Sequence, residues 1–440
     1  MVLPVIGVVA YRTPVPGPQE RAVPNPRRLI EEGPGFASTL RDLPSAIGIR
    51  PVSAGVVAAI FGCSGPALIV IGAAETNGLS NGQAVAWLLA IYGLGGLISL
   101  ILALYYRMPI TGAYSIPGAA LVAGSLSAFG FDQAVGAFIM AGVLVLALGF
   151  SGLIGRVMRW LPLPIVMAMI AGALIRFGIG TVTSASKLPI VVGLTILAFF
   201  VSMRLTKAVP PVLTALVVGL LAAWATGSFG GSEAAIGFVA PEFTLPRFTL
   251  DAFLAISVPL AILVIGAENA QAIGVLLAEG YRPPINAMTI ISGIGGVLAG
   301  LLGGHNANIA GPMTAICASD QAGEDRGRRY AATVVNGALF AAFGIFGGLA
   351  VPVILMLPGP LIGAVAGLAM INVFLMAFQS AFDRAAGYQL GALVALVVAM
   401  SNVSILGISA PFWALVAGAA VSLLVEGTGG PRSGTAKAAR

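Results

Sequence analysis

Residues 303–318, GGHNANIAGPMTAICA, decide how this chain folds. They separate two long apolar runs, and their polar residues stop at Gly311-Pro312, where an apolar run of helix formers begins. This order predicts a short extended strand, a break, and a helix that starts part-way across a membrane. Residues 108–125, MPITGAYSIPGAALVAGS, repeat the order and break at Ile116-Pro117-Gly118. We therefore expect two half-helices that meet end to end and form a binding site.

The composition is that of a polytopic membrane protein. Hydrophobic residues make up 58% of the 440 positions and charged residues only 9%, too few to cover the surface of a soluble protein. The net charge of +6 comes from basic residues in short connections and tails, so it does not indicate a nucleic-acid partner. The two cysteines, Cys63 and Cys317, lie in predicted spans, which favours buried packing residues over a disulfide.

The chemistry-bearing motifs of enzymes are missing from the sequence. It contains no nucleotide-binding loop, no metal-ligand cluster and no nucleophile–base constellation. With one histidine and two cysteines, neither catalytic residues nor a bound metal or cofactor are expected. Without a nucleotide-binding motif, any transport across the membrane would take its energy from an ion gradient.

Hydropathy and charge together predict the number of membrane crossings. Residues 109–128 and 305–321 are short candidate spans, and if both cross, only three of the 22 basic residues lie off the cytoplasmic side: Lys187, Arg247 and Arg176. This distribution favours fourteen spans with both termini cytoplasmic. Twelve longer apolar runs, each near the length of about 20 residues that a bilayer requires, supply the other spans: 52–74, 83–106, 131–154, 162–183, 188–206, 209–227, 252–278, 284–302, 330–356, 358–379, 387–401 and 405–426.

Fourteen spans divide into two units of seven, roughly residues 52–227 and 249–427. A unit with an odd number of spans inserts the second time in the opposite orientation, which produces an inverted repeat. Pro117 and Pro312 then lie in the third and tenth spans. The predicted fold class is an all-α polytopic membrane protein with two spans that are half strand and half helix. Residues 1–50 are expected to form a mostly disordered cytoplasmic tail.

The two half-helices predict an anion site. Helix starts leave backbone N–H groups without partners and carry partial positive charge. The residues before the prolines, Ile116 and Gly311, offer no capping oxygen. The N–H groups expected to bind a carboxylate or another compact anion are therefore those of Gly118, Ala119, Met313 and Thr314.

Polar residues within the spans supply the other candidates. Glu268 is the one acidic residue deep in an apolar run, and an intramembrane carboxyl that changes protonation is a natural proton coupler. His305 either relays protons or packs the outer mouth. Arg176 either attracts anions or snorkels to an interface. Residues 62–66, GCSGP, are expected to break the first span and place Ser64 beside the site, although a plain proline kink fits as well.

Several motifs resemble the benzoate:proton symporter (BenE-type) family, and the resemblance covers roughly residues 40–427. They are YRMP at 106–109, SIPGAAL at 115–121, GGH at 303–305, TAICA at 314–318, RRY at 328–330, SILGI at 404–408 and PFWALVAG at 411–418. This family is similar to a wider fold shared by nucleobase, sulfate and bicarbonate transporters.

The resemblance implies a division into two domains. A core domain would hold residues 51–160 and 249–357, and a gate domain residues 161–248 and 358–427, with a cytoplasmic tail at 428–440. Substrate would bind between the third and tenth spans, and the core would move against the gate as an elevator. The resemblance also implies that Glu268 contacts substrate, that the protein lies in the inner membrane, and that a homodimer forms through the gate domain.

Three functions remain open. The first is proton-coupled import of benzoate or a related aromatic carboxylate, in which the ring would contact Tyr114, Ile116 and Ile309 and Glu268 would carry the proton. The second is a nucleobase-like heterocycle:proton symporter, in which Asn306 or Asn308 would add amide contacts. The third is a passive anion channel. One departure from the family pattern bears on substrate choice. After Gly-Gly-His, residues 306–312 of this chain, NANIAGP, are more polar than the family pattern and end in a proline.

Overall fold

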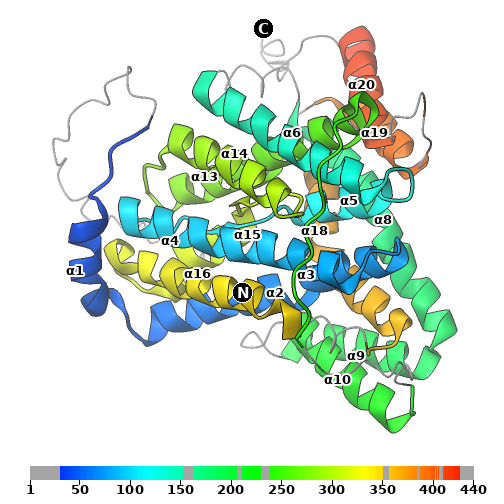
Figure 1. Cartoon of the computed structure of the whole chain (residues 1–440), viewed down its shortest axis with the longest axis horizontal. Helices are drawn as coiled ribbons and strands as arrows, with labels where there is room; N and C mark the ends of the chain where they lie inside the picture. The colour runs from blue at the N-terminus through cyan, green and yellow to red at the C-terminus, as the bar shows by residue number, and fades with distance from the viewer. Residues whose placement is uncertain are drawn as a thin grey trace, which may run out of the picture.

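The computed structural model describes residues 30–151, 162–205, 211–228, 238–349, 356–383, 387–401, 403, 405 and 410–426. Most of these residues are helical (Figure 1). The first half contains α1 (Phe36–Ala46), α2 (Ile49–Thr76), α3 (Asn81–Leu88), α4 (Leu94–Tyr106), β1 (Gly112–Ala113), α5 (Ile116–Ser125), α6 (Phe131–Ser151), α8 (Leu163–Lys187), α9 (Pro189–Leu205) and α10 (Pro211–Ala225). A π-helical turn, Leu89–Gly93, joins α3 and α4 into one helix.

The second half also contains one short strand that is followed by a short helix. It contains α11 (Leu250–Ala252), α12 (Val258–Leu263), α13 (Ala270–Ala278), α14 (Ile285–Leu301), β2 (Asn308–Ile309), α15 (Gly311–Ala318), α16 (Tyr330–Ile345), α18 (Gly359–Ala381), α19 (Gln389–Ser401) and α20 (Ala410–Val421). Two π-helical turns, Phe253–Ser257 and Val264–Asn269, join α11, α12 and α13 into a continuous helix. Another π-helical turn, Ser422–Glu426, follows α20.

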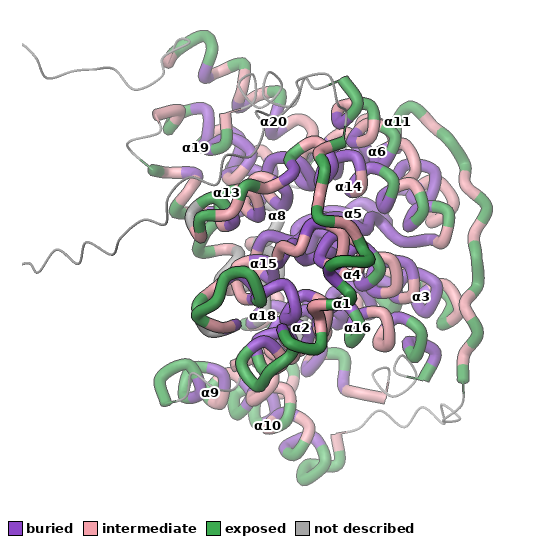
Figure 2. The backbone as a smooth tube through the Cα atoms, turned by 90° about the vertical axis from the view of Figure 1, so that its left-hand side faces the viewer, coloured by how far each residue is buried: buried purple, intermediate pink, exposed green. Residues whose placement is uncertain are grey.

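The long helices have the length and composition of membrane spans. Among the described residues, four qualify outright: Ile49–Thr76, Asn81–Tyr106, Phe131–Ser151 and Leu250–Leu277. Shorter apolar helices include α9, α10 and α14. Large apolar side chains of α9 and α10 are exposed, as lipid-facing side chains would be. Figure 2 shows the buried residues concentrated around α4, α5 and α14, and more exposure on α9, α10 and α19.

The helices pack in two groups. One group combines α2, α4, α6, α14, α15 and α16, and the other combines α8, α9, α10, α18, α19 and α20. Between α6 and α14, glycines bring the helix backbones close together; a methyl group at Gly293 would lie 2.5 Å from Leu146 Cα. The groups meet where α2 packs on α18 and α5 on α8.

An extended segment connects the second group to the first. Residues 239–249 lead from α10 toward α11 and cross the face of the molecule in Figure 1, along one edge in Figure 2. The backbone N–H groups of Glu242 and Arg247 donate to the carbonyls of Gly82 and Asp132, each 2.9 Å. These contacts fix the segment to the starts of α3 and α6.

Two predictions about the N-terminal region are wrong. Residues 30–50, assigned to a disordered tail, include α1, which packs on α4 and α16. The carboxylate of Glu31 accepts hydrogen bonds from the N–H groups of Asn286 and Ala287 at the start of α14 (2.9 and 3.0 Å), and therefore caps that helix. The predicted break at 62–66 is also absent, since α2 continues through Pro66.

Candidate functional site

The two strands form the centre of the site. They pair antiparallel, with Gly112 opposite Ile309 and Ala113 opposite Asn308. The two predicted strand–helix segments therefore do meet, as the sequence indicated. One more backbone hydrogen bond joins the two segments next to the strands. Ala310 N, just before α15, donates to Thr111 O, just before β1, at 2.8 Å.

The outer edges of this small sheet are closed by hydroxyl groups. Ser99 of α4 accepts from Gly112 N (2.8 Å) and donates to Gly112 O (2.9 Å). On the other side, Ser292 of α14 accepts from Ile309 N (3.3 Å). Strand edges are costly within a bilayer unless their backbone groups find partners. Glycine makes the approach possible, because a methyl group at Gly95 of α4 would lie 2.7 Å from Ala113 Cα.

The start of α5 is capped, contrary to the prediction. The helix begins at Ile116 with Pro117 as its second residue, so the cap is Ser115 rather than Ile116. The Ser115 hydroxyl accepts from Gly118 N (3.0 Å), and the Ser115 carbonyl accepts from Ala119 N (2.9 Å). The N–H groups of Gly118 and Ala119 are therefore not free to bind substrate.

The start of α15 has no side-chain cap of its own, as predicted. Its first N–H, from Gly311, points at Glu268 and donates to Oε2 at 3.4 Å. The N–H of Thr314 is used within the helix by the Ala310 carbonyl (3.1 Å), which contradicts the prediction that it is available. Met313 is fully buried and belongs to the apolar core.

Glu268 lies where both helix starts converge. It comes from the π-helical turn Val264–Asn269 and is only 5% exposed. Besides Gly311 N–H, its carboxylate interacts with the Ser115 hydroxyl and the Ile116 N–H. Because the Ser115 oxygen already accepts from Gly118, its hydrogen is available for Glu268. The anion bound by the two helix N-termini is thus the Glu268 carboxylate of the protein itself.

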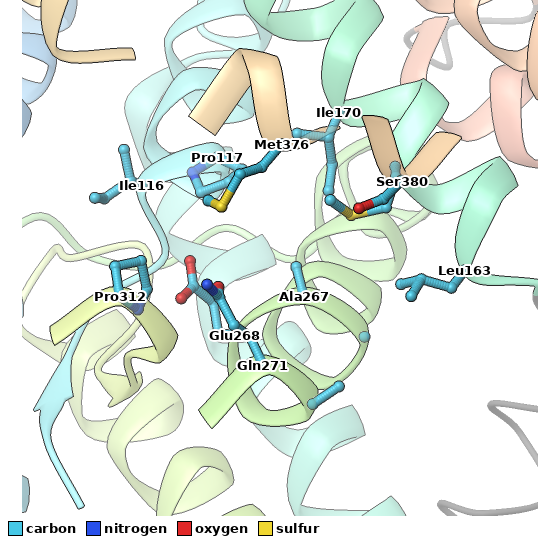
Figure 3. A pocket seen from close by; sticks show the side chains of 13 residues that line it. Ile116, Pro117, Leu163, Ile170, Ala267, Glu268, Gln271, Pro312, Met376 and Ser380 are labelled. Carbon is cyan, nitrogen blue, oxygen red and sulfur yellow. The ribbon is translucent and has the colours of Figure 1, made fainter. Parts of the chain in front are cut away.

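A cavity of about 290 Å³ opens beside Glu268 (Figure 3). One wall comes from the two helix starts and from the helix of Glu268, and the other from α8 and α18 of the second group. Most of the lining is apolar, and the polar side chains are Glu268, Gln271 and Ser380. A concave, mainly apolar site with a few polar groups is typical of small-molecule sites, and this one is at the small end of their range. The apolar lining includes Ile116, Pro117, Leu163, Met167, Ile170, Pro312 and Met376.

The structure brings only some of the predicted site residues to this cavity. Ile116 and Glu268 line it. Four others do not line it and are each between 0% and 3% exposed: Tyr114, Ile309, Asn306 and Asn308. Tyr114 shares a hydrogen bond between hydroxyl groups with Tyr92, Asn308 donates to the Ile309 carbonyl, and Asn306 Oδ1 accepts from Ser115 N. The side chains of Ser64 and Arg176 lie outside the described residues.

Gln271 was not predicted as a site residue, although a signal was present. It follows Glu268 by three residues in GAENAQA, a spacing that places two side chains on one helix face. Figure 3 shows its amide beside the Glu268 carboxylate.

His305 is fixed between two groups of opposite hydrogen-bonding character. Trp87 Nε1, which can only donate, lies 2.9 Å from Nδ1, and the carbonyl of Ser115, which can only accept, lies 3.0 Å from Nε2. The ring must therefore carry its hydrogen on Nε2, and a second proton on Nδ1 would face the Trp87 N–H. His305 is fully buried and does not line the cavity. This geometry argues against a proton relay and makes His305 a support for Ser115.

We expect a His305→Gln variant to keep the pH optimum of transport and at least a third of the rate. The glutamine amide offers one acceptor for Trp87 and one donor for Ser115, so the support is preserved. His305→Leu leaves the Trp87 N–H unpaired and should lower the free energy of unfolding by about 1–3 kcal/mol. Uptake as a function of pH, with thermal unfolding of both variants, checks this. A pH profile that flattens in His305→Gln would restore the relay interpretation.

No group of three or more His, Cys, Asp and Glu side chains gathers in the described part of the chain. Cys63 and Cys317 are free thiols.

Comparisons with known proteins match this chain to one family model and to two relatives. The BenE family model, described as benzoate membrane transport protein, matches residues 45–424. The chain is 30% identical over 372 residues to the inner membrane protein YdcO of Escherichia coli (strain K12), covering 83% of this chain and 93% of that protein. It is 25% identical over 383 residues to a benzoate membrane transport protein of Acinetobacter baylyi (strain ATCC 33305 / BD413 / ADP1), covering 87% and 97%.

Solved structures share the fold at low sequence identity. The transmembrane domain of the cyanobacterial bicarbonate transporter BicA superposes with a TM-score of 0.55 at 17% identity, covering 84% of this chain and 96% of that one. The murine anion transporter Slc26a9, in an inward-facing state, gives 0.56 at 15% identity, covering 88% and 70%. The fold is therefore that of a polytopic helical membrane transporter.

Proposed function

Because this chain belongs to the BenE family of benzoate membrane transport proteins, we propose that it imports benzoate or a related aromatic carboxylate together with protons. The observation that carries the proposal is the cavity, an apolar chamber with one carboxyl group where two helix starts converge. Its apolar side chains suit an aromatic ring.

The position of Glu268 gives a physical reason for proton coupling. Two ionised carboxylates side by side in a site of low polarity repel each other, whereas one proton shared between them forms a strong hydrogen bond. A carboxylate substrate therefore enters beside Glu268 only when a proton enters as well. Release of the substrate frees that proton, and substrate and proton move together.

The arrangement of cavities supports alternating access. A second cavity of about 760 Å³ lies at the other ends of α8 and α18, where Lys187 and Gly359 contribute to its lining. The first cavity is lined at the opposite ends of the same two helices, by Leu163 and Ser380. In the predicted topology the first cavity faces the cytoplasm and the second the outside. Movement of the core domain along α8 and α18 would carry Glu268 from one cavity toward the other, as in an elevator.

We also propose that the chain is divided into the core and gate domains predicted from the sequence. The core domain comprises residues 51–160 and 249–357, and the gate domain residues 161–248 and 358–427. The protein lies in the inner membrane with fourteen spans, related as inverted repeats, and both termini in the cytoplasm. A homodimer would form through the gate domain.

Uptake into proteoliposomes tests the function directly. We expect labelled benzoate to accumulate at least tenfold when the outside is made acidic, and accumulation to stop when a protonophore collapses the gradient. Excess unlabelled benzoate should compete, whereas uracil and xanthine should not. Competition by the nucleobases alone would favour the heterocycle symporter. Uptake that persists after the gradient collapses would indicate a passive channel.

A further inference from the structure

Gln271 contributes a polar side chain to the lining of the cavity. It lies on α13 three residues after Glu268, is half-buried, and lines the cavity. None of the described residues forms a hydrogen bond with its amide. An amide in this position offers two N–H donors and an acceptor oxygen to whatever occupies the cavity.

The packing of Gln271 explains the glycine at the start of α15. A methyl group at position 311 would lie 2.5 Å from Gln271 Oε1 and 2.7 Å from its Cβ. Gly311 thus gives its N–H to Glu268 and at the same time leaves room for the Gln271 side chain. The amide is consequently held against the helix start and beside the Glu268 carboxylate (Figure 3).

The backbone N–H groups of Gly118 and Gly311 are already occupied. Ser115 caps Gly118, and Glu268 takes the N–H of Gly311. Apart from Glu268 and Gln271, the polar side chain in the lining is Ser380, on α18 across the cavity. Placing a charged carboxylate against the remaining apolar wall would leave it without hydrogen bonds, which is costly.

We propose that Gln271 and protonated Glu268 together form the carboxylate subsite for the aromatic acid, an assignment that rests on the function proposed above. The carboxylate of the substrate accepts one hydrogen bond from the Gln271 amide and one from the Glu268 carboxyl. The ring then lies among Met167, Ile170 and Met376, where sulfur–aromatic contacts are favourable. Gln271 is therefore a binding residue that distinguishes carboxylates from uncharged aromatic compounds.

The first test is the KM for benzoate of a Gln271→Met variant in proteoliposomes. Methionine keeps the length and apolar stem of glutamine but cannot donate a hydrogen bond. Loss of one hydrogen bond to a charged group corresponds to about a tenfold to hundredfold rise in KM. Gln379→Met is the matched control, because Gln379 is exposed on α18 and does not line the cavity. Its KM should stay within twofold of the wild type.

Two further variants separate binding from folding. Gly311→Ala keeps Glu268, Gln271 and the N–H group but displaces the Gln271 side chain, so it should raise KM in the same direction. Gln271→Glu adds a second carboxyl group to the subsite, and uptake should then need a more acidic pH. A purely structural role for Gln271 would not shift the pH profile.

The outcomes distinguish this subsite from the proposed function. If wild-type protein takes up benzoate with protons but Gln271→Met and Gly311→Ala keep a KM within twofold of it, the subsite assignment is wrong. An unshifted pH profile in Gln271→Glu also overturns it. If the wild type shows no proton-dependent uptake of benzoate, the proposed function itself fails, whatever the variants do.

Discussion

A Glu268→Gln variant is expected to lose proton-driven accumulation of benzoate, with a fall of at least tenfold, while exchange of benzoate across the membrane continues. The glutamine oxygen can still accept from Gly311 N–H, so the two helix starts keep their partner. The amide cannot take up or release a proton at any pH of interest. It resembles the protonated acid, which is the state we propose for binding the substrate.

Two measurements on the same proteoliposomes check this expectation. Accumulation driven by an acidic outside should fall to the level of protein-free vesicles, and counterflow of labelled benzoate against an internal pool should persist without pH dependence. Glu324→Gln is the matched control, since this side chain is 86% exposed and, within the described part of the chain, pairs with exposed Arg50. Accumulation in Glu268→Gln equal to that of the control would remove Glu268 from proton coupling.

The second large effect is expected from Arg329→Met. The guanidinium is buried, with only 5% of the side chain exposed, and bonds three groups. Its Nη1 donates to Glu279 Oε2 at 2.8 Å and to the carbonyl of Ala318, the last residue of α15, and its Nε donates to Gly323 O at 2.7 Å. The positive charge of Arg329 is favourable at the C-terminus of α15. Removal of this buried charge would leave the Glu279 carboxylate without its partner, which is unfavourable.

Methionine retains the apolar stem of Arg329 but removes every one of these bonds. We expect the free energy of unfolding to fall by about 3 kcal/mol. Because α15 begins at Gly311, beside Glu268, a loosened C-terminal end of this short helix should also lower benzoate uptake. Thermal unfolding in detergent and uptake at one temperature measure the two effects.

The neighbouring arginine provides the control for this experiment. Arg328 is more than half exposed, and its ion pair with Asp325 is 3.3 Å long and equally exposed. Exposed pairs contribute little, about 0–1 kcal/mol. Arg328→Met should therefore unfold close to the wild-type temperature. If Arg329→Met unfolded at the same temperature as Arg328→Met, the buried contacts would not be stabilising α15.

Local order along the chain was sufficient to predict the strand–helix segments. Polar residues followed by proline and then by small helix formers marked both of them, and Glu268 stood out as a lone acid in an apolar run. Composition alone identified a polytopic membrane protein. Family motifs pointed to the transporter class, which the comparisons confirm. These features depend on neighbours in sequence, and for this reason they could be inferred without a structure.

The details of the site depend on residues far apart in sequence. The cap of α5 was missed because proline was assumed to be the first helical residue, whereas it is the second. The role of His305 depends on Trp87, 218 residues away, and on Ser115. Likewise, α1 lies in the segment that the sequence assigned to a disordered tail, but the helix is stabilised by contacts with α4 and α16. No local sequence pattern indicates contacts between residues so far apart in the chain.

The sheet between β1 and β2 also has a consequence for the order of assembly during synthesis. Gly112 leaves the ribosome long before Ile309, with which it pairs. Until then the edge of β1 that will face β2 has no partner, although Ser99 already closes the opposite edge. A chain that ends before residue 308 can insert its early helices but cannot complete the strand pair. The substrate site is consequently among the last parts of the molecule to form, and neither half of the chain contains it alone.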